Sequence, residues 1–193
     1  MKEILFFSNN KDKIKEIKKL FKFKSVKVLT LEDVSIAGEP KELGRAFEEN
    51  AIIKSNYGFD KFGIPCFADD SGICIESMRW APGGLSKRFL EKFKTKEDCF
   101  NYIFKKINKV KKKRAFFKTS ISLTTDRRQN ILFNGRIDGT ITLKKRGLNG
   151  FGYDPIFIPL NFKITLAEMK LKQKNSVSHR SIAITKLINF LFN

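Results

Sequence analysis

The spacing of apolar and polar residues predicts alternating strands and helices over the first third of the chain. An apolar run at residues 4–7 predicts a buried strand over residues 2–7. After a polar loop at residues 8–13, apolar residues recur opposite a face of lysines, which predicts a helix ending near residue 23. The apolar face of that helix consists of Ile14, Ile17, Leu20 and Phe21.

The same patterning continues to the C-terminus and predicts an α/β fold. The further strands expected span about residues 25–30, 64–69, 72–76, 114–124 and 130–143. The further helices expected span about residues 44–62, 96–108, a short segment opening with the capping-box pattern Thr165 to Glu168, and residues 178–192. A turn at Asp126 to Asn130 would join the last two strands as an antiparallel hairpin, so the sheet is expected to be mixed.

Composition favours one cytoplasmic domain over residues 1–193. The chain is 41% hydrophobic and long enough to bury a substantial core. Its three cysteines are odd in number and lack metal-ligand spacing, which favours a reducing compartment and no disulfides. No apolar run approaches the roughly 18 residues that a membrane span needs, so no membrane partner is expected.

The net charge of +19 raises the hypothesis of nucleic-acid binding. The densest basic cluster, residues 105–114, contains no interleaved aromatic residue, unlike surfaces that stack on single strands, and favours a solvated helix end. We therefore expect no specific nucleic-acid partner. The positive field would still attract anionic substrates such as nucleotides.

The most informative segment of the chain runs from Cys66 to Glu76. Asp69 and Asp70 separate two apolar runs and are followed at once by Ser71 and a glycine. Because neighbouring side chains on a strand point to opposite faces, an Asp-Asp pair here is not amphipathic patterning and indicates a site. The same rule predicts that the two carboxylates face apart, so that one acts directly and its neighbour supports it.

A second candidate is the polar loop after the first strand, which contains Ser8, Asn9, Asn10, Lys11, Asp12 and Lys13. A strand that feeds a lysine-bearing helix through small polar residues offers backbone N–H groups and the positive end of a helix dipole to a phosphate. The same residues also suit an ordinary turn and helix cap. It is not a Walker loop, because the glycines and the Lys-Ser/Thr pair are missing.

Acidic and aromatic groups mark two further segments. Glu39 and Glu42, before the second helix, are exposed acids of a turn, and Glu48 and Glu49 suit the start of the helix. Either pair could instead supply a ligand to a hard metal ion. Residues 147–155 alternate glycines with aromatics, a pattern typical of a loop against a flat ligand or of a hairpin with core aromatics. The single histidine, His179, lies near donors suited to an anionic or carbonyl-rich ligand, although a lone histidine is often incidental.

Several motifs stand in order along the chain: Ser8-Asn9-Asn10 with Lys13 and Glu16, Phe47-Glu48-Glu49-Asn50-Ala51 with Lys54, Ala68-Asp69-Asp70-Ser71-Gly72, Ala81-Pro82-Gly83, Gly150-Phe151-Gly152-Tyr153-Asp154-Pro155, and Ala167-Glu168 with Lys174-Asn175 and Ser178-His179-Arg180. Their order and composition resemble the inosine triphosphate pyrophosphatase family, also called the Ham1-like family. The resemblance extends from Ser8 to about Leu187. No single motif would suffice to indicate this family.

The resemblance implies cleavage of a purine nucleoside triphosphate between the α and β phosphates, with Mg²⁺ as cofactor. It implies a preference for ITP, dITP and XTP and a role in cleansing the nucleotide pool. It also implies an elongated mixed β-sheet flanked by helices, two lobes around a central nucleotide-binding cleft, and a homodimer.

The resemblance also assigns roles to individual residues. Asp70 matches the proposed proton acceptor and metal ligand, Asp69 supports it, and Ser71 should hydrogen-bond the substrate. Glu42 is preferred to Glu39 as the second metal ligand. The residues expected to bind the triphosphate are Ser8, Asn9, Asn10, Lys11, Asp12 and Lys13. Those expected to recognise the base, including its 6-keto oxygen, are Phe151, Gly152, Tyr153, Asp154, Lys174, His179 and Arg180.

Departures from the family pattern and three rival functions stay open. Asp12 stands where many members have glycine, and Lys41 interrupts an acidic pair. Nucleic-acid binding alone leaves the Asp-Asp segment unexplained. A Maf-like pyrophosphatase acting on modified pyrimidines lacks the Ser-His-Arg ending. A Cys-His hydrolase would need Cys66 or Cys74, which lie in apolar runs and are expected to be buried.

Overall fold

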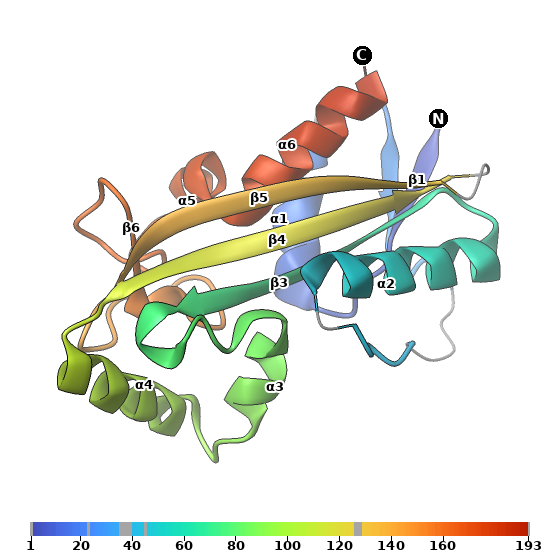
Figure 1. Cartoon of the computed structure of the whole chain (residues 1–193). Helices are drawn as coiled ribbons and strands as arrows, with labels where there is room; N and C mark the ends of the chain where they lie inside the picture. Colours follow the sequence, from blue (N-terminus) through green and yellow to red (C-terminus); the bar gives the residue numbers. More distant parts are fainter. Residues whose placement is uncertain (1, 23, 35–39, 45, 126–128, 193) are drawn as a thin grey trace. The chain divides into compact units, whose positions relative to one another are not determined.

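The computed structural model describes residues 2–22, 24–34, 40–44, 46–125 and 129–192 (Figure 1). Contacts within the chain divide it into two compact units. Unit 1 comprises Met1–Asp70, Thr119–Gly135 and Arg180–Asn193. Unit 2 comprises Ser71–Lys118 and Arg136–His179.

The described strands form one mixed sheet in the order β2-β1-β3-β4-β5-β6. Their bounds are β1 Glu3–Phe6, β2 Lys27–Leu29, β3 Cys66–Ile75, β4 Arg114–Thr124, β5 Asn130–Ile141 and β6 Phe157–Pro159. β1 pairs in parallel with β2 and β3, whereas β5 pairs antiparallel with β6. The predicted mixed α/β fold is therefore confirmed, and β3, β4 and β5 contribute residues to both units.

The longer helices follow the sequence order that the apolar spacing predicts. The α-helices are α1 Lys11–Phe21, α2 Phe47–Phe62, α3 Ser86–Glu91, α4 Lys96–Val110, α5 Leu171–Val177 and α6 His179–Phe192. Short 3₁₀ turns are η1 Glu76–Met78, η2 Gly83–Leu85 and η3 Asp154–Ile156. No helix in the part of the chain that the structure describes is long and apolar enough to cross a membrane.

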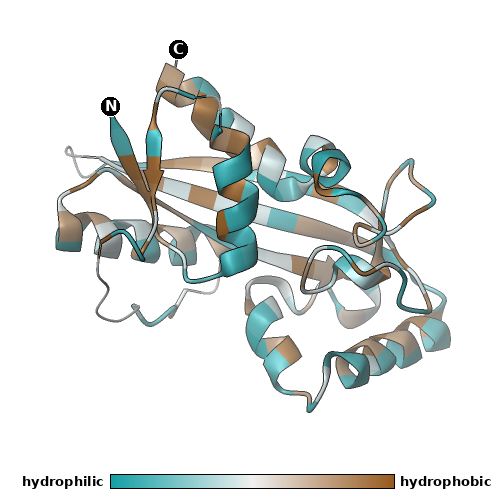
Figure 2. Cartoon of the chain, turned by 180° about the vertical axis from the view of Figure 1, so that it is seen from behind, coloured by the Kyte–Doolittle hydropathy of each residue, from teal (hydrophilic) through white to brown (hydrophobic). Residues whose placement is uncertain are grey.

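Unit 1 has an apolar core on each side of its strands. Ile4 and Phe6 of β1 belong to a cluster that includes Ile17 of α1 and residues of α6. Leu5 and Phe7 belong to a second cluster, against which residues of α2 pack. Because successive strand residues point to opposite faces, the continuous apolar run of β1 supplies both cores. Figure 2 shows the side that carries α1, whose outward surface is hydrophilic.

α2 approaches the strands closely at Gly58. A Cβ at this position would lie 2.5 Å from Cys66 Sγ and 2.8 Å from Phe7 Cδ2, so no side chain fits there without separating α2 from β1 and β3. Cys66 is fully buried at this contact, and burial raises the pKa of its thiol. The cysteine therefore has a packing role, which disfavours a Cys-His hydrolase.

Unit 2 is held by aromatic packing and by a well-capped helix. Thr95 caps α4, since its hydroxyl accepts the N–H of Asp98 while the Asp98 carboxylate accepts the N–H of Thr95. Phe117 of β4 packs edge-on against Phe157 of β6, with ring centroids 4.8 Å apart. The predicted helix at residues 96–108 is confirmed, with a longer last turn ending at Val110.

Two element predictions were wrong. Residues 64–69 and 72–76 are not separate strands, because β3 runs unbroken through the Asp-Asp pair. The capping-box pattern at Thr165 forms its contacts, since Glu168 Oε2 accepts the Thr165 N–H at 2.7 Å, but a turn follows and α5 begins only at Leu171. Arg146 binds the same carboxylate and fixes the turn.

Two short elements were not predicted, and one predicted turn cannot be compared. The patterning missed α3 and β6, which are short and lack a full period of apolar positions. The predicted hairpin turn falls mainly on residues 126–128, outside the described part of the chain.

Candidate functional site

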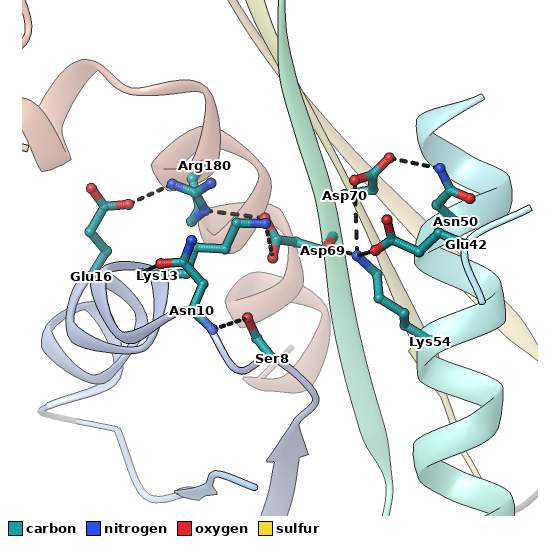
Figure 3. Close-up of polar contacts among 10 residues, drawn as sticks. All are labelled: Ser8, Asn10, Lys13, Glu16, Glu42, Asn50, Lys54, Asp69, Asp70 and Arg180. Carbon is teal, nitrogen blue, oxygen red and sulfur yellow. Dashed lines mark hydrogen bonds and ion pairs between the residues drawn. The ribbon is translucent and has the colours of Figure 1, made fainter. Parts of the chain in front are cut away.

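The Asp-Asp pair lies within the continuous strand β3. Phe67, two residues before Asp69, belongs to the core shared by α1 and α6, and Ala68, two residues before Asp70, belongs to the core against which α2 packs. Strand alternation therefore directs Asp69 toward α1 and α6 and Asp70 toward α2. Figure 3 shows the two carboxylates on opposite sides of β3.

Asp69 is enclosed by an ion network. Its Oδ1 accepts from Lys13 Nζ at 2.9 Å and its Oδ2 from Arg180 Nε at 3.3 Å, while Arg180 Nη1 donates to Glu16 Oε2 at 2.6 Å. The carboxylate of Asp69 and the guanidinium of Arg180 are almost completely buried. Buried charges persist only when they are paired and hydrogen-bonded, and this network meets that condition.

The same network sets the protonation of its cations. Burial opposes the charged form of Arg180, but Asp69 and Glu16 outweigh burial and raise its pKa. Burial lowers the pKa of Lys13, and the Asp69 carboxylate only partly offsets this effect. The pKa of Lys13 is thus lowered while that of Arg180 is raised, because burial and the nearby cations Arg180 and Lys54 outweigh the Asp69 carboxylate at Lys13.

Asp70 has different surroundings, and its closest side-chain partners come from α2. Asn50 Nδ2 donates to Asp70 Oδ2 at 3.2 Å, and Lys54 Nζ lies 3.9 Å from Asp70 Oδ1. Burial raises the pKa of Asp70, and the attraction of Lys54 only partly opposes it. The structure therefore makes Asp70 a less strongly paired carboxylate than its neighbour, in keeping with a group that handles a proton or a metal ion.

Lys54 joins the groups on this face of β3. Its Nζ lies 2.8 Å from Glu42 Oε1 and donates to the backbone carbonyl oxygen of Asp69 at 2.6 Å. Burial opposes its charged form, but Asp70, Asp69 and Glu42 together raise its pKa. A single positive charge thus lies within 4 Å of both Asp70 and Glu42.

The carboxylates that share the Lys54 ammonium fit a Mg²⁺ site. Hard cations take carboxylate oxygens, and Mg²⁺ is usually held by one or two carboxylates together with substrate phosphates. Asp70 and Glu42 offer two carboxylates that converge on one cation. No group of three or more His, Cys, Asp or Glu side chains suited to a metal exists among the described residues. Glu39, the alternative ligand, lies outside them.

The loop after β1 forms the cap of α1. Asn10 Oδ1 accepts the N–H of Lys13 at 3.1 Å, and Ser8 Oγ accepts the N–H of Asn10 at 3.3 Å. The helix begins at Lys11, so Lys11 and Asp12 lie in its first turn and both are exposed. Asn9 is exposed beside them. The structure thus forms the helix cap, and phosphate binding by Ser8 to Lys13 stays a prediction.

In unit 2, Asp154 organises a cation and an aromatic ring. Its Oδ2 accepts from Lys174 Nζ at 2.7 Å and from the N–H of Phe151 at 2.8 Å. Lys174 Nζ lies 4.8 Å from the centre of the Phe151 ring. Asp154 and Lys174 are buried, whereas Phe151 is half-buried. Three predicted base-binding residues therefore form one cluster.

Other predicted base-binding residues pack within unit 2. Tyr153 is buried and donates its hydroxyl to the backbone oxygen of Ser86 at 2.8 Å, and burial raises its pKa. His179 stacks on Phe117 with ring centroids 4.6 Å apart. Gly152 lies in the turn between Phe151 and Tyr153 and is half-buried, as is Ser71 in β3.

Sequence reasoning gave no role to Asn50, Lys54 or Glu16, although all three stand in the recognised motifs. Asn50 and Lys54 are four residues apart and so share one face of α2, the face toward Asp70. This spacing beside the Asp-Asp pair was the available signal. The pairing of Glu16 with Arg180 had no comparable signal, because 164 residues separate them.

Three comparisons with known proteins agree with one another. A model of the Ham1 family matches residues 4–190. The dITP/XTP pyrophosphatase of Flavobacterium johnsoniae is 41% identical over 189 residues, which cover 98% of this chain and 97% of that protein.

Solved structures extend the likeness to the fold. A HAM1 protein from Coxiella burnetii superposes with a TM-score of 0.89 and 32% identity, covering 100% of this chain and 99% of that chain. The Ham1 protein of Staphylococcus aureus gives a TM-score of 0.87 and 34% identity, with 98% of each chain covered.

Proposed function

The chain belongs to the Ham1 family, and from this we propose that it hydrolyses noncanonical purine nucleoside triphosphates such as ITP, dITP and XTP to the monophosphate and pyrophosphate. The support is a relative named dITP/XTP pyrophosphatase that matches 98% of the chain at 41% identity. The single structural observation that carries the chemistry is the pair of carboxylates, Asp70 and Glu42, around one cation position.

Asp70 is our candidate for the group that orients water and accepts its proton. Asn50 holds one carboxylate oxygen of Asp70, and burial weakens the ionised form, so the carboxylate is a better proton acceptor than an exposed aspartate. Asp70 and Glu42 would hold Mg²⁺, which supplies positive charge against the charge that develops on the phosphates. The water oxygen would bond to the α-phosphorus, and the bond from that phosphorus to the oxygen bridging the α and β phosphates would break. Pyrophosphate would leave with the bridging oxygen, and Asp70 would take the proton of the water.

Lys13 and Lys54 are the cations that we assign to the triphosphate. Each contacts a carboxylate or carbonyl group of the Asp-Asp pair, so an incoming phosphate would compete for an ammonium that is already close. Asn9, Asn10 and Ser8 would add neutral donors at the start of α1. Because Asp12 is exposed in this first turn, its charge would be largely screened.

We assign base recognition to the Asp154 cluster, with Phe151 against the purine ring and Lys174 donating to it. Donors at the base favour the 6-keto oxygen of inosine and xanthine over the 6-amino group of adenine, because donor would otherwise face donor. The contribution of His179 to this recognition is part of the proposal. For Arg180 we propose support of Asp69, its observed partner.

Pyrophosphate release from ITP, XTP, dITP, GTP, ATP and dUTP, measured with and without Mg²⁺, tests the proposal. We expect turnover of the first three to exceed that of ATP and dUTP and to stop in EDTA. Equal rates with ATP and ITP would refute the substrate preference, and preferred hydrolysis of dUTP would favour a pyrimidine-directed pyrophosphatase. The molar mass of the protein, measured by light scattering as it elutes from a size-exclusion column, would test the proposed homodimer.

A further inference from the structure

We propose that Asn50 is a positioning residue that sets the separation of the two proposed metal ligands, Asp70 and Glu42. The inference rests on the proposed function, because it presumes a metal ion at these carboxylates. Asn50 contacts Asp70 directly, and it acts on Glu42 through the backbone of the segment that carries Glu42.

One end of the Asn50 amide holds Asp70. Nδ2 donates to Asp70 Oδ2 at 3.2 Å, and Asn50 itself is only 2% exposed. A buried amide with a fixed partner restrains the orientation of the carboxylate it contacts. Asp70 Oδ1, the other oxygen, faces Lys54.

The other end of the amide holds the segment that carries Glu42. Asn50 Oδ1 accepts the N–H of Gly44 at 2.9 Å, two residues after Glu42. The approach is close, because a Cβ on Gly44 would lie 2.6 Å from Asn50 Oδ1 and 2.7 Å from Glu49 Cβ. The segment can therefore lie this close to α2 only with glycine at position 44.

An amide suits this task better than a charged group. It donates to a carboxylate and accepts from a backbone N–H at once, without adding charge beside the metal ligands. The Lys54 ammonium also contacts both Glu42 and Asp70, but a metal ion would compete for that position. Asn50 can keep both of its contacts whichever cation is present, so it can maintain the ligand spacing.

The test measures Mn²⁺ binding to the metal-depleted protein by electron paramagnetic resonance, without nucleotide. Asn50→Leu keeps the side-chain size and removes both contacts. We expect its Mn²⁺ affinity to fall by about tenfold or more, as is typical when a partner of a metal ligand is lost. We also expect half-maximal activity at a correspondingly higher Mg²⁺ concentration, with kcat largely recovered at saturating Mg²⁺ and the KM for ITP nearly unchanged.

Gly44→Ala tests the same link from its other end. The added Cβ should displace the Glu42 segment and weaken Mn²⁺ binding, although α2 and Asp70 are unaltered. Gly63→Ala is the matched control at the far end of α2, where φ is +66° and nothing lies within 4 Å of an added Cβ. Backbone strain should lower its Tm but leave Mn²⁺ affinity unchanged.

The outcomes separate a positioning role from a structural one. Weaker Mn²⁺ binding in both Asn50→Leu and Gly44→Ala, but not in Gly63→Ala, supports the proposal. Lower Tm with unchanged Mn²⁺ affinity in Asn50→Leu overturns it, as does absence of Mn²⁺ binding in the unaltered protein. If the unaltered protein binds Mn²⁺ but releases no pyrophosphate from any nucleotide, the proposed function fails while the Asn50 result still stands.

Discussion

Asp69 and Asp70 are adjacent in the chain but have opposite environments. Asp69 contacts two cations, and one of them contacts a further carboxylate, Glu16. Asp70 has an amide at 3.2 Å and an ammonium at 3.9 Å, and burial raises its pKa. Strand alternation underlies the difference, since it directs one carboxylate to α1 and α6 and the other to α2.

The comparison teaches that burial has two consequences for a carboxylate, depending on its partners. Asp69 has a cation at each carboxylate oxygen and links β3 to α1 and α6, so its removal would leave buried cations with fewer partners. Asp70 is compensated only in part, so its ionised form is retained at some expense of stability. A carboxylate of the second kind is suited to bind a metal ion or a proton.

The largest effect should come from Asp70→Asn. We expect kcat for ITP to fall by about 10³-fold, within the range for loss of an acid-base group, without loss of folded protein. Asn50 can still donate to the new side-chain oxygen, so the local packing should remain. Steady-state kinetics beside circular dichroism would measure this. Nearly full activity in the variant would remove Asp70 from the mechanism.

Asp69→Asn should act mainly on stability. The substitution leaves the buried Arg180 with one carboxylate partner and Lys13 with none in the network, and breaking a buried pair costs roughly 3–5 kcal/mol. Urea unfolding monitored by fluorescence of the single tryptophan would measure this difference. Glu16→Gln is the companion variant, and we expect a smaller loss because Arg180 keeps Asp69. An unfolding free energy equal to that of the unaltered protein would show that the network is not stabilising.

A smaller contrast is expected between two lysine substitutions. Lys54→Met removes the cation beside Asp70 and Glu42, so Mn²⁺ should bind the nucleotide-free protein several-fold more tightly, because it no longer competes with an ammonium. Lys13→Met removes the same charge on the other face of β3 and should change Mn²⁺ binding less. Calorimetric titration would compare them. Equal increases in Mn²⁺ affinity for the two variants would indicate that the overall positive charge weakens binding, instead of competition with Lys54 at one position.

The smallest predicted effect is a pH dependence of stability without metal. A raised pKa means that the folded state binds the Asp70 proton more tightly than the unfolded state does. Ionised Asp70 therefore opposes folding above its folded-state pKa, and this opposition disappears as the pH falls toward about 3.9. In EDTA, Asp70→Asn should be more stable than the unaltered protein at pH 7, with the difference vanishing near pH 4. A difference that grows on acidification would contradict the assigned direction.

Much of the fold followed from periodicity, and its misses have local causes. The strand of residues 2–7 and the helix of residues 178–192 have clear apolar repeats, and both were confirmed. The break expected within β3 came from reading Asp69 and Asp70 as the ends of strands. In the structure their side chains have ionic and hydrogen-bonding partners on both faces, so the backbone stays extended.

The sequence indicated which residues belong to the candidate site, but it did not indicate which of them form ion pairs with one another. Alternation predicted that Asp69 and Asp70 face apart, and the family resemblance indicated which of them acts directly. The partners of Asp69 could not be deduced, because Lys13 and Arg180 are 56 and 111 residues away in the chain and meet it only after folding. The expectation that Arg180 contacts the base is untested. Its observed partners are two buried carboxylates, Asp69 and Glu16.

Gly58 links the packing of the core to the proposed metal site. Because an added Cβ would lie 2.5 Å from Cys66 Sγ, α2 can keep its present distance from β3 only with glycine at this point. Asn50 lies eight residues earlier on the same helix, about 12 Å along its axis at 1.5 Å per residue. A relative that acquires a side chain at position 58 would have to tilt or shift α2, and its ligand distances would change without any substitution among the ligands. We therefore expect the mutational tolerance of this buried position to be limited by the proposed metal site as well as by packing.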